Sequence, residues 1–233
     1  MTSVTISVII PTLNEEKSLP QTLACLSASG VTEVVIVDGG SLDKTISIAE
    51  AFCAKTSNAR IVTAPAGRAR QMNEGAKASQ GDILLFLHAD TQLPAEARLM
   101  IEAALTNPAV GGGSFDVTFT PPSVWGTMIS TLMNWRSRLS GIATGDHALF
   151  VHRHVFEQLG GFPDIPLMED IEFSRRLKRT GQITALHQTV TTSFRRWEQQ
   201  GPLRTILLMW TLRFLYWGGV SPHHLKSFYA AIR

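Results

Sequence analysis

Two aspartates occupy positions that suit the binding of a charged ligand. Asp38 and Asp90 each follow a run of aliphatic residues, at the point where the chain turns polar. Mg²⁺ usually takes one or two carboxylates plus phosphate oxygens, so Asp90 could hold a divalent cation against a diphosphate. Asp38 precedes two glycines that let backbone approach a ligand, which suits a hydrogen bond from a base ring. Both could instead be turn residues without a chemical role.

Two further groups carry opposite charges. Arg68 and Arg70 open a predicted helix after a glycine, where guanidinium groups could bind phosphate oxygens bidentately. Glu169 and Asp170 open a later predicted helix, where a carboxylate could be the general base that takes a proton from an attacking hydroxyl. The residues leave alternatives open: the arginines could be solvated surface groups, and the helix dipole favours acids at a helix start whatever their function.

Short aliphatic runs predict the strands that position these residues. The runs 4–10, 34–37 and 83–87 lack alternation, which is typical of strands buried on both faces of a parallel sheet. Helices are predicted over 15–29, 42–55, 69–79 and 95–105, with N-caps at Asn14 and Ser41 and C-terminal stops at Gly30 and Gly81. This alternation implies right-handed crossovers in an open α/β sheet.

The predicted architecture says where a ligand should bind. In open parallel sheets, ligands sit outside the carboxyl ends of the strands. Asn14, Asp38 and Asp90 all fall at such ends, so we expect them to converge on one edge of the sheet.

The second half of the chain has a different pattern. Residues 115–119 alternate as a strand does, 123–139 have the spacing of an amphipathic helix, and another strand is expected over 148–151. A helix is predicted over 167–181, with Glu172 and Arg176 spaced for an i,i+4 ion pair. We expect one domain over residues 1–197 and an apolar helical tail over 198–233.

Composition excludes several classes of protein. The 233 residues carry a net charge of +2, so nucleic acid is not expected as a partner. Cys25 and Cys53 belong to no CxxC or Cys/His cluster, which favours reduced thiols in the cytoplasm over a zinc site or disulfide framework. No signal-peptide pattern is present at the start. No GxGxxG follows the first predicted strand, which argues against a dinucleotide oxidoreductase.

In their order along the chain, these segments resemble the motifs of family 2 glycosyltransferases with the GT-A fold. The resemblance covers about residues 3–197 and rests on SVIIPTLNE at 7–15, VDGGSLDKT at 37–45, NEGA at 73–76, HAD at 88–90, LGGF at 159–162 and MEDIE at 168–172. It implies an open, mostly parallel, twisted α/β sheet flanked by helices. It also implies metal-dependent transfer of a sugar from a nucleoside-diphosphate sugar to an acceptor hydroxyl, with inversion at the anomeric carbon.

The resemblance implies a role for each matching position. Asp90 would hold Mn²⁺ or Mg²⁺, and Asp170, with Glu169 beside it, would be the catalytic base. The acceptor side would include Asp146, His147, Arg196 and Trp197. The residues expected to bind the donor are Pro11, Thr12, Asn14, Glu15, Asp38, Arg68, Asn73, His88 and Ala89.

Two departures from the family pattern affect these expectations. His88 replaces the first aspartate of the Asp-x-Asp motif, and we expect its imidazole to contact the donor; as a metal ligand it would suit Mn²⁺ better than Mg²⁺. The processive members carry Gln-x-x-Arg-Trp, whereas Ser193 precedes Arg196-Trp197 here. This difference, and the lack of predicted membrane spans, favours single sugar transfer. His88 leaves one alternative open, a catalytically idle protein that binds nucleotide sugars.

The sequence of the tail does not decide what its apolar surface contacts. Residues 202–219 are apolar almost all round and include Trp210, Phe214 and Trp217. A helix of this kind is buried or associated with lipid. One interpretation is packing on the domain or in a homodimer interface. The other is peripheral contact with the inner face of the membrane, which would make a lipid-linked acceptor expected.

Overall fold

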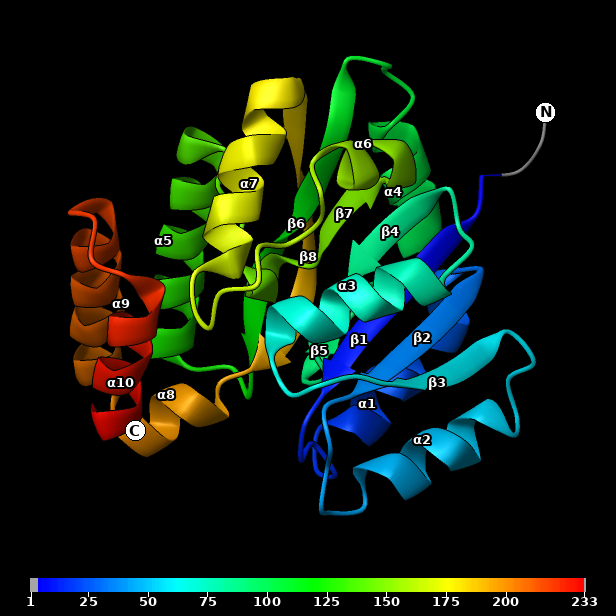
Figure 1. The fold of residues 1–233 in the computed structure, drawn as a ribbon, viewed down its shortest axis with the longest axis horizontal. Coiled ribbons are helices and arrows are strands. Elements are labelled where there is room, and N and C mark those ends of the chain that lie inside the picture. Colours follow the sequence, from blue (N-terminus) through cyan, green and yellow to red (C-terminus); the bar gives the residue numbers. More distant parts are fainter. Residues whose placement is uncertain (1–3, 233) are drawn as a thin grey trace.

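The computed structural model describes residues 4–232, which form a sheet of eight strands with helices on both faces (Figure 1). The strand order is β3-β2-β1-β4-β7-β6-β8-β5. The first four strands are parallel, with the bounds Ile6–Thr12 (β1), Glu33–Asp38 (β2), Ala59–Thr63 (β3) and Ile83–Phe86 (β4). β1, β2 and β4 are buried almost throughout, as their unbroken aliphatic runs predict.

The other half of the sheet is mixed. β7 (Leu149–His152) runs antiparallel to both β4 and β6 (Val110–Thr120). β8 (Gln182–Ser193) is parallel to β6, and the short β5 (Thr91–Gln92) is antiparallel to β8. No strand is predicted over 182–193, because this segment lacks an unbroken aliphatic run; its pairing with β6 is what makes it a strand. The predicted open, mostly parallel α/β sheet flanked by helices is confirmed.

Two apolar cores lie on opposite faces of the sheet. One contains residues of α1 (Leu19–Ser29), α2 (Thr45–Cys53), α4 (Ala97–Ala104) and α5 (Val124–Ser140). The other contains residues of α3 (Arg68–Ala78), α6 (Arg153–Gln158) and α7 (Glu169–Thr180). A Cβ atom at Gly75 would collide with Ile9 and Val37, so this glycine lets α3 lie close against β1 and β2.

Two predicted helix caps are wrong. Asn14 does not cap α1; its Oδ1 accepts a hydrogen bond from the backbone N–H of Leu42 at 2.8 Å. Ser41 does not cap α2; its hydroxyl donates to the Asp38 carboxylate at 2.5 Å. Bonds between the loops that follow β1 and β2 therefore use the side chains that local pattern assigns to caps. Gly30 does end α1 in the left-handed conformation, with φ 74°.

Two more local predictions are also wrong. α3 ends before Gly81, which packs against β1 instead of ending the helix. Arg176 does not pair with Glu172, because its guanidinium donates to carbonyl groups of the turn at 159–161 at 2.6 and 2.7 Å. Glu172 pairs with Arg175 instead, at 3.3 Å.

The C-terminal helices are present at the end of the molecule where α5 and α7 lie (Figure 1). They are α8 (Arg195–Gln200), α9 (Pro202–Trp217) and α10 (Pro222–Ile232). Leu208 and Leu212 of α9 share a small apolar core with Met168 and Ile171, at the start of α7. The predicted boundary at residue 197 falls within α8 and stays a prediction. Within residues 4–232, no helix has the length and apolar character needed to cross a bilayer.

Candidate active site

The carboxyl ends of β1 and β2 meet at one edge of the sheet, where Thr12 and Asp38 are register partners. Gln71 of α3 links the ends of these two strands. Its side-chain amide donates hydrogen bonds to the carbonyl oxygens of Thr12 at 2.7 Å and Val37 at 2.8 Å. Gln71 is 4% exposed. Because β4 lies on the other side of β1, Asp90 follows a strand that ends at the same edge.

Asp38 organises the loop that follows β2. Its carboxylate accepts hydrogen bonds from the backbone N–H groups of Gly40 at 2.8 Å and Ser41 at 2.9 Å, and from the Ser41 hydroxyl. Gly40 has φ 94°, a conformation that favours glycine. Asp38 therefore fixes the shape of the surface on which a donor would lie, and its predicted contact with a base stays a prediction.

Asp90 and Glu15 form an acidic pair at the same edge. Burial and the negative charge of Asp90 raise the pKa of Glu15 above its ordinary value. Glu15 Oε2 is buried and has no hydrogen-bond partner among the described residues, although Arg195 lies 3.7 Å away. Residues 4–232 contain no cluster of three or more His, Cys, Asp or Glu side chains that could hold a metal ion. A cation at Asp90 would therefore need oxygen atoms from a ligand, as Mg²⁺ usually does.

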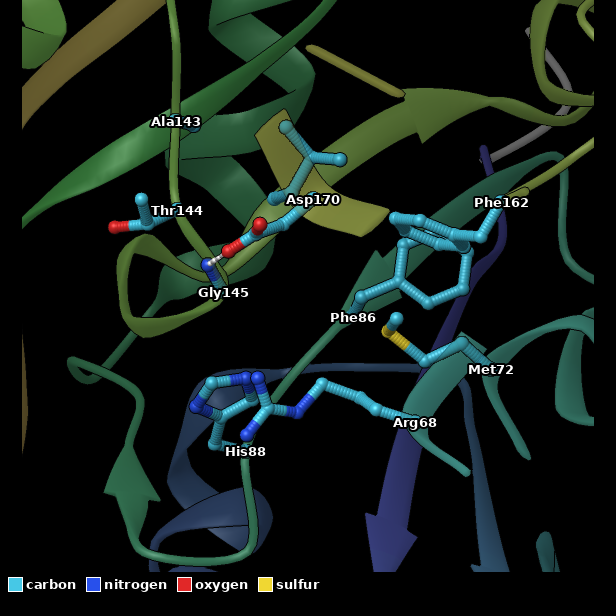
Figure 2. A pocket seen from close by; sticks show the side chains of 10 residues that line it. Arg68, Met72, Phe86, His88, Ala143, Thr144, Gly145, Phe162 and Asp170 are labelled. Atoms are coloured by element: carbon cyan, nitrogen blue, oxygen red, sulfur yellow. Dashed lines mark hydrogen bonds between the residues drawn. The ribbon is translucent and has the colours of Figure 1, made fainter. Parts of the chain in front are cut away.

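A pocket lies beside this edge, between α3 and the start of α7 (Figure 2). Its apolar lining includes Phe86 and Phe162, whose rings pack edge to face with centroids 4.8 Å apart. Its polar lining includes Arg68, His88 and Asp170. Figure 2 shows the Asp170 carboxylate directed to the backbone N–H of Gly145. The remaining lining residues are Met72, Ala143, Thr144, Gly145 and Leu149.

The acid pair at the start of α7 divides into two positions. Asp170 lines the pocket, and its Oδ2 accepts a hydrogen bond from the backbone N–H of Gly145 at 2.7 Å. Glu169 is buried behind it, with Oε1 3.4 Å from Nη1 of Arg68. Burial and the negative charge of Asp170 raise the pKa of Glu169. Asp170 is thus the candidate base, and Glu169 is the residue that positions Arg68.

His88, which follows β4, contacts the segment at 145–147 through its ring. Its Nδ1 lies 3.1 Å from Oδ1 of Asp146, in the short helical turn η1 (Gly145–His147). Burial would raise the pKa of Asp146, but the hydrogen bond and positive charge of His88 lower it below its ordinary value. A Cβ atom at Gly145 would collide with the His88 ring, so glycine is needed for this approach. The structure therefore pairs His88 with the predicted acceptor side, and its contact with the donor stays a prediction.

Backbone strain clusters around the same region. Three residues, Asn14 (φ 56°), Ala148 (φ 47°) and Met168 (φ 69°), have a left-handed backbone conformation that residues other than glycine adopt infrequently. They flank the donor-side loop, the turn η1 and the acid pair; Glu96, with φ 59°, lies elsewhere. Each such residue costs about 1–3 kcal/mol, and such strain is typical of functional sites.

Some predicted donor residues use their polar groups to build the site. The amide of Asn73 bonds with both backbone groups of Phe162, at 2.8 and 2.9 Å, and so fixes the turn at Gly160 and Gly161. These bonds use one donor and one acceptor position of the Asn73 amide, and its predicted contact with the donor stays a prediction. Thr12 and Ala89 are buried, at 1% and 5% exposure, whereas Pro11 is half-buried at the end of β1.

The predicted acceptor residues separate in the structure. His147 is fully buried, and its Nδ1 lies 3.0 Å from the Thr144 hydroxyl. The ring of Trp197 packs against Phe119 and Phe194, so it supports α8 and does not line the pocket. Arg196 is exposed, and its charge helps to lower the pKa of Asp146.

Local sequence pattern predicts no role for Gln71 and does not predict that residue 145 must be glycine. The signal for Gln71 was its position four residues before Gly75, which puts it on the helix face that approaches the sheet. Gly145 had no such signal, because the ring that requires it comes from a residue 57 positions earlier, His88.

The chain matches a family model over more than half of its length. The model is described as Glycosyl transferase family 2, and the match covers residues 7–160. An undecaprenyl-phosphate 4-deoxy-4-formamido-L-arabinose transferase of Pseudomonas aeruginosa (strain LESB58) is 31% identical over 160 residues, 64% of this chain and 46% of that protein. A probable glycosyltransferase of Bacillus subtilis (strain 168), YdaM, is 27% identical over 216 residues, 84% of this chain and 50% of that protein. The chain thus spans about half the length of these curated relatives.

Solved structures resemble the fold. The mannosyltransferase PcManGT from Pyrobaculum calidifontis, in complex with GDP-Man and Mn²⁺, has a TM-score of 0.65 at 22% identity, covering 81% of this chain and 56% of that one. A glucosyl-3-phosphoglycerate synthase from Mycobacterium tuberculosis, in complex with Mg²⁺ and UDP, has a TM-score of 0.57 at 20% identity, covering 80% and 70%. These likenesses show the fold.

Proposed function

Because the chain belongs to glycosyl transferase family 2, we propose that it moves one sugar from a nucleoside-diphosphate sugar to an acceptor hydroxyl, with inversion. The observation that carries this proposal is that Asp170, Arg68 and His88 line one pocket. A base and a cation beside the same small pocket suit a displacement in which an acceptor hydroxyl attacks and a diphosphate leaves.

The proposed step needs few groups. Asp170 accepts the proton of the acceptor hydroxyl while the acceptor oxygen bonds to the anomeric carbon. The bond from that carbon to the diphosphate breaks, and the nucleoside diphosphate leaves with the electron pair. Arg68 lies where it can bind the departing phosphate oxygens, held by Glu169 at 3.4 Å.

Asp90 would hold Mg²⁺ or Mn²⁺, which would neutralise the charge that develops on the diphosphate. Its carboxylate fits this role, because its only neighbouring donor described here, the Thr91 hydroxyl, is 3.5 Å away, and because it lies close to the acidic Glu15. The PcManGT and synthase structures contain such ions, which supports a divalent metal.

The decisive experiment is a screen of nucleoside-diphosphate sugars for release of nucleoside diphosphate, with Mn²⁺, with Mg²⁺ and with chelator. We expect one donor to be turned over in a metal-dependent manner, and its product to have the opposite anomeric configuration by NMR. Asp90→Ala should remove the metal dependence of donor binding in calorimetry. Asp164→Asn, an exposed acid paired with Arg70, is the matched control and should bind as the parent does.

The alternative is a catalytically idle protein that binds nucleotide sugars, favoured by the replacement of an aspartate by His88. Slow hydrolysis of the bound donor separates the two, because a transferase releases nucleoside diphosphate and an idle binder does not.

Single transfer is favoured by Ser193, which stands where processive members carry glutamine. A ladder of products from one acceptor would contradict it.

A lipid-linked acceptor has its own support. On α5, the exposed apolar side chains Val124, Met128, Leu132, Trp135 and Leu139 form one stripe with helical spacing. On α9, Leu203, Leu207, Trp210, Phe214 and Trp217 form another. Apolar stripes with tryptophan beside basic residues, here Arg195 and Arg196 of α8, are typical of helices that lie in a membrane interface. The relative from Pseudomonas carries undecaprenyl-phosphate in its name.

We expect the protein to bind the cytoplasmic face of membranes through these stripes, which flotation with vesicles tests. Trp210→Ser with Trp217→Ser should abolish flotation with anionic vesicles at low salt. Leu99→Ser removes an apolar side chain of 57% exposure from α4 and serves as control. Absence of flotation together with a dimer in sedimentation would replace the lipid by a second copy of the chain.

A further inference from the structure

Two arginines beside the candidate base lack a matching anion. Arg136 lies on α5 and Arg213 on α9. Within residues 4–232, Nε and Nη2 of Arg136 are buried without a hydrogen-bond partner, and Nη1 makes one long bond of 3.4 Å to the carbonyl oxygen of Ile142. Arg213 is half-buried and forms neither a hydrogen bond nor an ion pair with any part of the chain that the structure describes. Buried guanidinium groups without partners are costly, so these donors call for an anion.

The two cations influence each other and the candidate base. Burial and the positive charge of Arg213 lower the pKa of Arg136 to about 10. Burial also lowers the pKa of Arg213, whereas the negative charges of Asp170 and Asp146 act in the opposite direction on both arginines. Each of these carboxylates forms its hydrogen bonds elsewhere, Asp170 with a backbone N–H and Asp146 with an imidazole. Each arginine therefore interacts electrostatically with Asp170, but neither forms a hydrogen bond or ion pair with its carboxylate.

His147 adds a third unpartnered group. Its ring is fully buried, and its Nε2 has no hydrogen-bond partner among the residues described. Burial and the charge of Arg136 lower its pKa to about 4, so the ring is neutral near pH 7. The chain segment that links these groups is short: the 142–145 loop accepts the bond from Arg136 and donates the bond to Asp170.

We propose that Arg136 and Arg213 form a subsite for a phosphate group carried by the acceptor. A phosphate monoester carries a charge of about −1.5 to −2 near pH 7, which matches two guanidinium groups. Guanidinium groups also bind phosphate oxygens through paired N–H donors. The inference rests on the proposed transfer reaction, because it fixes the acceptor beside the base that would activate its hydroxyl. The phosphate belongs either to a small soluble molecule or to a lipid headgroup, with the same recognition chemistry.

The first test measures inorganic phosphate binding to the full chain by calorimetry and thermal unfolding. The parent should bind phosphate saturably and melt at a higher temperature in its presence. Arg136→Met and Arg213→Gln should each weaken phosphate binding by about tenfold or more. Arg204→Gln is the matched control, since it removes an exposed arginine from the same helix as Arg213, and should change the affinity by less than about twofold.

The melting temperature without phosphate separates binding from structure. Arg136→Met should melt at a higher temperature than the parent, because it removes a buried cation that has no anionic partner in the fold and only one long hydrogen bond. A structural arginine would give a lower melting temperature. Arg136→Lys, which keeps the charge and loses the paired donors, carries the test if the methionine variant does not fold. Equal phosphate affinity in the parent and in the Arg136→Met, Arg213→Gln double variant overturns the proposal.

Two acceptor arms identify the source of the phosphate. Glycerol 3-phosphate in solution, or 1-acylglycerol 3-phosphate in phosphatidylcholine vesicles, should compete with inorganic phosphate, and the stronger competitor names the class; each carries a free hydroxyl beside its phosphate group. If no donor is turned over while phosphate still binds through the two arginines, the transferase proposal fails and the subsite stands. If a donor is turned over while the two substitutions leave phosphate binding unchanged, the subsite fails and the transferase stands.

Discussion

The donor side and the acceptor side of the candidate site differ in how far their polar atoms are satisfied. At the ends of β1 and β2, Asp38 accepts hydrogen bonds from Gly40 and Ser41, and Gln71 bonds to two strand carbonyls. Between α5, α9 and the turn η1, Arg136 and His147 keep buried nitrogen atoms that no group in residues 4–232 satisfies. Apart from Oε2 of Glu15, these donor-side groups have their partners within the fold, whereas Arg136 and His147 on the acceptor side do not.

This difference says which part of the site is preformed. Buried polar groups in folded proteins almost always have partners, so those without one mark places where a ligand supplies it. The donor side is preorganised by its own hydrogen bonds, which lowers the cost of binding. Its exception, Oε2 of Glu15, lies beside Asp90, where a cation is proposed.

The largest expected effect comes from the group between the two sides. Asp170→Asn should lower kcat by about 10³-fold, the usual contribution of a general base, and should leave donor affinity unchanged. The control is Glu172→Gln, an acid of the same helix that pairs with Arg175. Kinetics and calorimetry measure both quantities, and a variant that keeps most of its activity would refute the assignment of Asp170 as base.

Acid should lower the free energy of unfolding through His147, the buried histidine of the acceptor side. The pKa of this buried ring is about 4, below its ordinary value of 6.5, because burial and the charge of Arg136 disfavour the imidazolium. The unfolded chain binds more protons between these values, so this contribution is full above about pH 6.5 and is lost toward pH 4. The loss should reach up to about 3 kcal/mol. Denaturant unfolding across this range should show a shallower pH slope in His147→Asn; an unchanged slope would contradict the assignment.

Two neighbouring arginines test the donor side. Arg68→Gln should weaken binding of the nucleoside diphosphate by about 10–100-fold, because a charged hydrogen bond to phosphate contributes about 1.5–3 kcal/mol. Arg70 lies two residues away and pairs with the exposed Asp164 at 2.8 Å. Arg70→Gln is therefore the matched control, with an effect below about 1 kcal/mol. Equal losses in both variants would mean that net charge, and not the pocket, attracts the donor.

The smallest effect should come from the donor-side scaffold. Gln71→Met leaves the carbonyl groups of Thr12 and Val37 without their donor. Unpaired buried polar groups cost about 1–3 kcal/mol, and carbonyl groups at a sheet edge should fall at the lower end. Gln158→Met, at an exposed position of α6, is the control. If the Gln71 variant loses no stability yet binds donor poorly, the glutamine contacts the ligand and does not hold the strands.

The edge of the sheet could be predicted because it depends on local pattern. Unbroken aliphatic runs specify buried parallel strands, and the carboxyl ends of such strands necessarily meet. Asp38 and Asp90 therefore reach the same edge whatever the rest of the chain does. The caps at Asn14 and Ser41 could not be predicted, because each side chain bonds to the other loop: Asn14 Oδ1 accepts from the backbone N–H of Leu42, and the Ser41 hydroxyl accepts from the backbone N–H of Asn14.

The sequence by itself determined the α/β class, the strand ends that carry the donor-side residues and the acid pair that opens α7. Tertiary structure alone decided that His88 pairs with Asp146, that Asn73 holds a turn and that Arg136 is buried within reach of the charge of Arg213. The physical reason is the separation along the chain of the residues that determine each feature. Strand and helix periodicity are set by neighbours along the chain, whereas the partner of a polar side chain depends on how two elements far apart in sequence are rotated against each other when their apolar faces pack.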